Sequence, residues 1–232
     1  MQNEDYGTLY LIPTPVGNLK DITHRALETL EAVDLIACED TRHSGQLLAH
    51  FGIKKKKISY FEHNESARVP RIIEMLQDGQ SIAVISDGGS PGLSDPAYRI
   101  VSAAVEEGIR VEALPGATAA IPALTASGLP TDRFFFEGFL PVKSGKRKTR
   151  LQKLAEFPHT IIIYESVHRI KKSLNAIAEV FGNRQICVAR EISKMYEEYT
   201  RGTAIEVALE YESKTAKGEF VIIIAGNKDV EK

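Results

Sequence analysis

A glycine-rich segment in the middle of the chain carries the residue types best suited to bind a polar ligand. It runs from Ser86 to Asp95, after the strand-like segment 81–85 and before an expected helix. Ligands of α/β proteins commonly bind at such strand-to-helix loops. Closely spaced glycines let a backbone approach a bound molecule, while aspartates accept and serines donate hydrogen bonds. The Asp87–Ser90 half therefore predicts a ligand site.

The end of the same segment has a structural explanation. Asp95 precedes Pro96. Aspartate is a favoured N-cap, and proline suits the first helical position because its missing N–H would lack a partner there in any case. We expect Asp95 to cap a helix that ends at Gly108.

Two further turns constrain the ligand. Small residues at 114–120 place Thr118 where it could cap a helix, and this turn could form a second wall beside the glycine segment. The first strand leads into a loop with Pro13 and Pro15, which lack N–H donors, and no G-x-G-x-x-G pattern follows. These features predict close backbone contacts to a neutral or cationic ligand and argue against a pyrophosphate cradle and a nicotinamide enzyme.

Charged clusters follow two other expected strands. Carboxylates and a guanidinium occur together at 39–43, and Tyr164, Glu165, His168 and Arg169 mark the start of an expected helix. Each cluster could serve a ligand. Each could equally be a solvated group of ions, with Glu165 favoured by the helix dipole.

A basic segment at 143–150 contains no carboxylate and follows the aromatic run 134–139. Aromatic and cationic residues occur together on nucleic-acid surfaces, although these phenylalanines also fit a core strand and a run of charge is commonly a solvated face. Its glycine and serine predict a mobile loop suited to phosphates. A second run, Lys54–Lys57, fits the protection of a strand start.

Composition narrows the classes of protein. The 232 residues are 43% hydrophobic, enough for two cores, and the net charge of −2 offers no global attraction for nucleic acid, so a polyanion would need a local patch. Cys38 and Cys187 lack metal-site spacing and are expected to be buried thiols in a reducing compartment. No apolar segment approaches the roughly 18 residues of a membrane span. We expect a cytoplasmic protein without a metal.

Short apolar runs alternate with helical periodicity along the chain, which predicts α/β layers with mostly parallel or mixed sheets. A division after Pro115 is the most economical, giving domains 1–115 and 116–232. The expected strands are 9–12, 35–37, 58–61, 82–85, 111–113, 134–139, 161–164, 186–189 and 220–225. The expected helices are 22–33, 67–78, 96–107, 118–127, 151–156, 170–181 and 204–210.

Ordered motifs over nearly the whole chain resemble the ribosomal RNA small subunit methyltransferase I family, of the tetrapyrrole methylase-like, class III enzymes. The matching segments are 13–23, 38–42, 86–96, 115–120, 127–134, 137–141, 164–169, 189–191 and 217–219. The departures, Gly88 and Ala97, exchange one small residue for another. The resemblance implies two α/β domains with a cofactor cleft between them, and methyl transfer from S-adenosylmethionine to the ribose 2′-hydroxyl of a cytidine in the decoding region of 16S rRNA.

The resemblance also implies site residues and partners. The cofactor would contact Gly88, Gly89, Ser90, Leu93, Thr118, Ala119, Tyr164, Glu165, Ala189 and Glu219. If the substrate is RNA, the charge of the basic segment predicts contacts through Lys143, Lys146, Arg147, Lys148 and Arg150. The substrate would be 16S rRNA within the 30S subunit, and the active unit a homodimer.

The catalytic residues are chosen on chemistry. A ribose hydroxyl is a weak acid, so an acceptor or a cation near the developing alkoxide should help. We expect Glu165 and Asp87 as acceptors, and Arg42, Arg169 or Arg190 as positioning cations. Two other functions remain open: a tetrapyrrole C-methyltransferase, whose anionic substrate would also suit the basic segment, and a non-catalytic rRNA-binding assembly factor.

Overall fold

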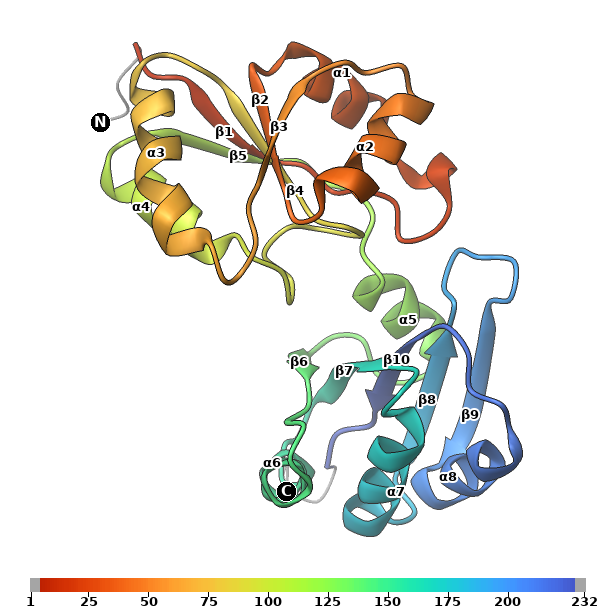
Figure 1. Cartoon of the computed structure of the whole chain (residues 1–232). Helices are drawn as coiled ribbons and strands as arrows, with labels where there is room; N and C mark the ends of the chain where they lie inside the picture. The colour runs from red at the N-terminus through yellow and green to blue at the C-terminus, as the bar shows by residue number, and fades with distance from the viewer. Residues whose placement is uncertain (1–4, 228–232) are drawn as a thin grey trace. The chain divides into compact units, whose positions relative to one another are not determined.

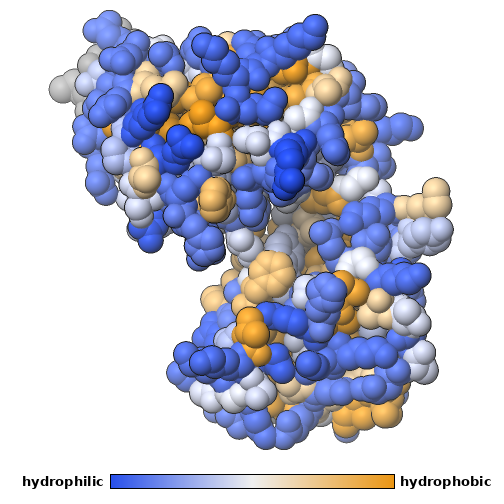
Figure 2. Space-filling view, viewed as in Figure 1, coloured by the Kyte–Doolittle hydropathy of each residue, from blue (hydrophilic) through white to orange (hydrophobic). Residues whose placement is uncertain are grey.

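The chain divides into two compact units, Met1–Thr118 and Ala119–Lys232. The computed structural model describes residues 5–227, and Figure 1 labels their helices and strands. On the face shown in Figure 2, hydrophilic residues cover most of both units. The apolar side chains are gathered in separate cores on either side of each sheet.

Unit 1 is a five-stranded parallel sheet in the order β3-β2-β4-β1-β5. Its strands are β1 (Thr8–Leu11), β2 (Leu35–Cys38), β3 (Lys56–Ser59), β4 (Ile82–Ile85) and β5 (Arg110–Ala113). Its helices are the 3-10 helix η1 (Leu19–Asp21), α1 (His24–Ala32), α2 (Thr41–His50), α3 (Glu65–Gln77) and α4 (Tyr98–Glu106). Because all strands run in one direction, the loops that follow them lie at one edge of the sheet.

Alternation along the strands separates the two cores of unit 1. Leu35 and Ala37 pack with α3 and α4, whereas Ile36 and Cys38 pack with α1 and α2. Successive strand residues point to opposite faces, so a strand covered on both sides is apolar throughout. The central strand β4 is accordingly buried at all its positions.

Unit 2 has a mixed sheet in the order β6-β7-β10-β8-β9, in which β6 and β7 are parallel and the other neighbours antiparallel. Its strands are β6 (Phe134–Phe139), β7 (Thr160–Ser166), β8 (Gln185–Arg190), β9 (Glu198–Thr203) and β10 (Glu219–Ile224). Its helices are α5 (Ala120–Ser127), α6 (Ser144–Ala155), α7 (Ile170–Phe181) and α8 (Ala204–Ser213). Helices α6, α7 and α8 pack on one face, and α5 on the other.

The expected fold class, two mostly parallel or mixed α/β sheets, is confirmed. Cys38 and Cys187 are fully buried, as expected, and burial raises the pKa of each thiol. No helix within residues 5–227 has the length and apolar character needed to cross a lipid bilayer.

Two local predictions are wrong, and one helix is missing from the expected set. Helix α2 is not among the expected helices, because its sequence contains little apolar periodicity. The basic segment was expected to be mobile, yet Ser144 begins helix α6. Asp95 is no N-cap, since α4 begins at Tyr98 with Ala97 in that position.

Candidate functional site

The glycine loop follows the central strand β4 and is fixed against the loop after β1. Thr14 and Gly89 exchange two backbone hydrogen bonds, with N···O distances of 2.9 and 2.8 Å. The Thr14 hydroxyl also donates to the carbonyl of Ser86 at 3.0 Å. These bonds hold the loop open at the carboxyl edge of the sheet, where Asp87 and Gly88 are exposed.

Two glycines are required by the local geometry of unit 1. Gly89 has φ of +95°, a conformation that side chains rarely adopt. A Cβ at Gly116 would lie 2.8 Å from the Cβ of Pro13. Ser90 donates from its hydroxyl to the carbonyl of Ala117 at 3.1 Å. The two small-residue turns therefore lie side by side, as expected.

Carboxylates from two strand ends surround the glycine loop. Burial, with the charges of Glu39 and Asp87, raises the pKa of Asp95 to about 6. Burial, with the charges of Asp87 and Asp40, also raises the pKa of Glu39. Crowding of like charges makes this edge attractive to a cation and hostile to a phosphate. The sequence predicted Asp95 only as a helix cap, and Glu39 only as part of the 39–43 cluster that could serve a ligand. Their positions after adjacent strands were the signal for a shared site.

Helix α2 brings Arg42 to the same edge. Asp40 caps the helix by accepting from the Arg42 N–H at 2.8 Å, and hydrogen bonds from the Arg42 side chain hold the pKa of Asp40 at about 2. The Asp40 N–H donates to Asp87 Oδ1 at 3.3 Å, and His43 Nε2 lies 3.1 Å from the Asp87 carbonyl oxygen. The Arg42 side chain is 89% exposed. Asp40 thus bonds to both Arg42 and Asp87, and the catalytic roles expected for these two residues stay predictions.

In unit 2, three of the expected cofactor residues share one side of the sheet. Tyr164 and Ala189 are both register partners of Val221, and Ala119 packs in the same apolar cluster. The Tyr164 hydroxyl accepts from the N–H of Ala120 at 3.1 Å. Because α5 has Ala119 at its N-cap, the expectation that Thr118 caps this helix is wrong.

Glu165 points to the opposite face from Tyr164. Its side chain is fully buried, and Oε1 accepts from Arg169 Nε and from the Ser166 N–H, each at 2.8 Å. The hydroxyl of Ser173 donates to Oε2 at 2.5 Å. An enclosed carboxylate with these partners is in no position to accept a proton from a substrate, so the geometry argues against catalytic and cofactor-binding roles for the Glu165 side chain.

The other expected positioning cations are also engaged. Arg169 donates to Glu165 and to the Leu140 carbonyl, while Arg190 donates to the Lys217 carbonyl at 2.7 Å and pairs with Glu198 at 3.3 Å. Glu219, by contrast, is 81% exposed and pairs with Lys194 at 2.8 Å.

The basic segment presents only part of its charge to solvent. Lys148 pairs with Glu179, and Arg150 forms two hydrogen bonds with Glu137. Arg147 is 7% exposed and donates from Nη1 to the Val142 carbonyl at 3.3 Å. Lys143 and Lys146 are exposed at the first turn of α6. Of the expected RNA-binding residues, these two have the geometry that such a role requires.

Within residues 5–227, no three histidine, cysteine, aspartate or glutamate side chains are arranged to hold a metal ion.

Comparison with known proteins identifies the class to which this fold belongs, the tetrapyrrole methylases. The sequence model of the tetrapyrrole (corrin/porphyrin) methylases matches residues 8–208. A solved uroporphyrin-III C-methyltransferase from Thermus thermophilus, complexed with S-adenyl homocysteine, superposes with a TM-score of 0.62 over 94% of this chain and 97% of its own at 21% identity.

Curated relatives narrow the class. The chain is 47% identical over 226 residues to "Ribosomal RNA small subunit methyltransferase I" of Halalkalibacterium halodurans, covering 97% of this chain and 78% of that protein. It is 51% identical over 224 residues to the protein of that name from Haemophilus influenzae, covering 95% and 79%. The chain therefore belongs to the ribosomal RNA small subunit methyltransferase I family of the tetrapyrrole methylases. It is an S-adenosylmethionine-dependent methyltransferase, so the expected cofactor is confirmed, and the expected enzyme class is confirmed as far as methyl transfer from that cofactor.

Proposed function

We propose that this protein methylates the ribose 2′-hydroxyl of a cytidine in the decoding region of 16S rRNA. The observation that carries the proposal is identity near 50% over almost the whole chain to proteins named for small-subunit ribosomal RNA methylation. The proposed site of action is the cytoplasm, on 16S rRNA assembled in the 30S subunit.

The carboxyl edge of the unit 1 sheet suits a positively charged cofactor better than a ligand that carries phosphates. S-adenosylmethionine supplies, when bound, an electrophilic methyl group on a positively charged sulfur. The carboxylates of Glu39, Asp87 and Asp95 favour a cation, and the loop with Pro13 and Pro15 cannot donate from those positions to a phosphate. We assign cofactor binding to Gly88, Gly89, Ser90, Leu93 and Thr118 of unit 1 and to Ala119, Tyr164, Ala189 and Glu219 of unit 2.

Catalysis rests mainly on alignment of the attacking oxygen, because an in-line displacement needs a near-attack geometry. The exposed Asp87 and the neighbouring Asp95 are the acceptors for the hydroxyl proton. A carboxyl whose pKa is about 6 is a stronger base than an ordinary aspartate and is still mostly ionised at neutral pH. The exposed guanidinium of Arg42 is the group to stabilise the alkoxide.

The first turn of α6 is the proposed RNA contact of unit 2. Lys143 and Lys146 sit at a helix N-terminus without an acidic residue in the first turn. The helix dipole and these ammonium groups both favour a phosphate there. We also propose that the active form is a homodimer, because one copy with a net charge of −2 offers few cations to a large RNA. Sedimentation that finds an active monomer would exclude the dimer.

The deciding experiment is to incubate the protein with labelled S-adenosylmethionine and 30S subunits from a strain that lacks the modification, then map the label by nuclease digestion and mass spectrometry. Label on a single cytidine ribose is expected. Label on a base, or on several nucleotides, would refute the proposed specificity. Cofactor binding without RNA labelling would favour a tetrapyrrole or another small acceptor, and RNA binding without cofactor binding would favour an assembly factor.

A further inference from the structure

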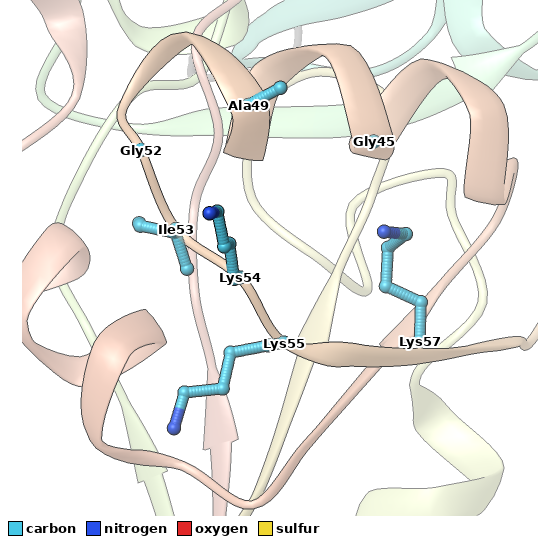
Figure 3. Close-up of a pocket in the computed structure, with 7 residues that line it drawn as sticks. All are labelled: Gly45, Ala49, Gly52, Ile53, Lys54, Lys55 and Lys57. Carbon is cyan, nitrogen blue, oxygen red and sulfur yellow. The ribbon is translucent and has the colours of Figure 1, made fainter.

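A basic depression of about 420 Å³ lies beside helix α2 in unit 1 (Figure 3). Its lining residues come from α2, from the turn after it and from the start of β3: Gly45, Ala49, Gly52, Ile53, Lys54, Lys55 and Lys57. Lys54 and Lys57 extend toward α2, whereas Lys55 points away from the helix (Figure 3). The pair Lys54 and Lys57 therefore borders the space that the helix leaves open.

Small residues create that space. Gly45 and Ala49 are four positions apart, so they share one face of α2. A Cβ added at Gly45 would already lie 3.7 Å from the Cε of Lys57. A larger side chain at Gly45 would therefore fill the depression and push Lys57 aside.

The depression is cationic and has no carboxylate in its lining. In the part of the chain that the structure describes, Lys54 and Lys57 take part in none of the ion pairs between side chains. Both ammonium groups face the same depression, so an anion bound there would be attracted by both.

Helix α2 connects the depression to the candidate methyl-transfer edge. Its first residues contact the glycine loop through the bonds of Asp40 and His43 to Asp87. With a rise of about 1.5 Å per residue, Gly45 lies roughly 5 Å and Ala49 roughly 10 Å along the axis from Arg42. Phosphates recur every few ångströms along a nucleic-acid strand, at about 3.4 Å of axis per strand in duplex DNA. An RNA strand whose target ribose lies at Asp87 would therefore carry neighbouring phosphates past this helix.

We propose that Lys54 and Lys57, which line the depression beside α2, bind backbone phosphates of the RNA strand next to the nucleotide that is methylated. This inference rests on the proposed function and adds a second phosphate contact, on unit 1, to that of α6 on unit 2. The lysine run would thus do more than protect the start of β3.

The test compares two double variants with equal changes of charge. Lys54→Glu with Lys57→Glu reverses the proposed contact. Lys56→Glu with Arg71→Glu is the control, because Lys56 alternates with Lys57 on β3 and does not line the depression, and Arg71 lies on α3, which covers the other face of the sheet. For each protein we would measure binding to 30S subunits that lack the modification over a range of salt concentrations, S-adenosylhomocysteine binding by calorimetry, and methylation of the same subunits.

The expected result is a loss of RNA affinity of at least about 10-fold in K54E/K57E and a shallower salt dependence, by roughly 0.7 to 0.9 per lost contact. S-adenosylhomocysteine binding should be unchanged. If K54E/K57E unfolds, the milder Lys54→Gln with Lys57→Gln should still show the loss. Equal affinities of K54E/K57E and its control would overturn the inference, as would a wild-type chain that does not bind RNA.

The two proposals fail in different ways. Methylation of 30S subunits by the wild type, with no special effect of the lysine pair, would leave the proposed function standing and refute the phosphate contact. RNA binding that depends on the pair, without any methylation of RNA by the wild type, would refute the proposed function alone.

Discussion

Thr14 and Gly89 form an antiparallel bridge between two loops of unit 1, with both backbone N–H groups donating across it. The bridge ties the end of the first strand to the glycine loop. Because Gly89 has a positive φ, the loop keeps its shape only while this position lacks a side chain.

Gly89→Ala should weaken cofactor binding by about 10-fold or more. The left-handed conformation costs an alanine roughly 1 to 2 kcal/mol, and the loop would relax away from the geometry that we assign to binding. Calorimetry with S-adenosylhomocysteine measures the effect. Gly79→Ala is the control, since Gly79 also has a positive φ, of +84°, but follows α3. An equal loss of affinity in both variants would show that general strain, and not the loop, is responsible.

Asp95→Asn should stabilise the protein at neutral pH and flatten its pH dependence. The folded-state pKa of Asp95 is raised to about 6, above its ordinary value of 3.8, so the folded protein retains this proton longer than the unfolded chain. Stability contributed by the protonated group is therefore lost as pH rises from about 4 to 6. The partly exposed carboxyl is screened by solvent, which reduces the effect to about 1 kcal/mol.

Urea unfolding of the wild type and D95N between pH 4 and 8 measures this effect. The difference in unfolding free energy should increase up to pH 6 and then remain constant. A difference that does not vary with pH would contradict the raised pKa. In the methylation assay, D95N should lower kcat more than it raises KM if Asp95 accepts the proton.

Glu165→Gln should act on stability and leave methyl transfer intact in the folded protein. Removing the carboxylate leaves the Arg169 charge largely buried and unpaired, at a cost of about 3 kcal/mol or more. Glu179→Gln, which breaks an exposed pair with Lys148, should cost less than about 1 kcal/mol. Unfolding curves and kcat at a temperature where both variants are folded separate the roles. A stable but inactive E165Q would restore Glu165 as a catalytic residue.

Lys143→Gln with Lys146→Gln should reduce RNA affinity several-fold, whereas Lys148→Gln with Arg150→Gln, which removes the same charge, should reduce it little. The first pair is exposed, and the second is held by Glu179 and Glu137. Filter binding at two salt concentrations distinguishes them, because each lost phosphate contact also lowers the salt dependence. Equal losses would mean that net charge alone governs binding to this helix.

The sequence alone was sufficient to predict the layers of the fold and the glycine loop. Apolar runs such as 82–85 and 161–163 are long enough for buried strands and too short for helices, and the helical periodicity between them requires crossovers. Gly88, Gly89 and Ser90 follow such a run, so their place at a strand end was determined locally. The family motifs along the chain were sufficient to predict the enzyme class, because each can be recognised from the sequence without knowing the fold.

The tertiary structure decided which charged groups face the site. Tyr164 and Glu165 are adjacent in sequence, yet strand alternation sends one to the α5 face and the other into a buried pair with Arg169. The pKa of Asp95 is raised first by burial and then by the charge of Glu39, which comes from another strand end. Spacing along a chain fixes which residues share a face, but burial and charge pairing depend on partners far away in sequence, and these exist only after the strands assemble.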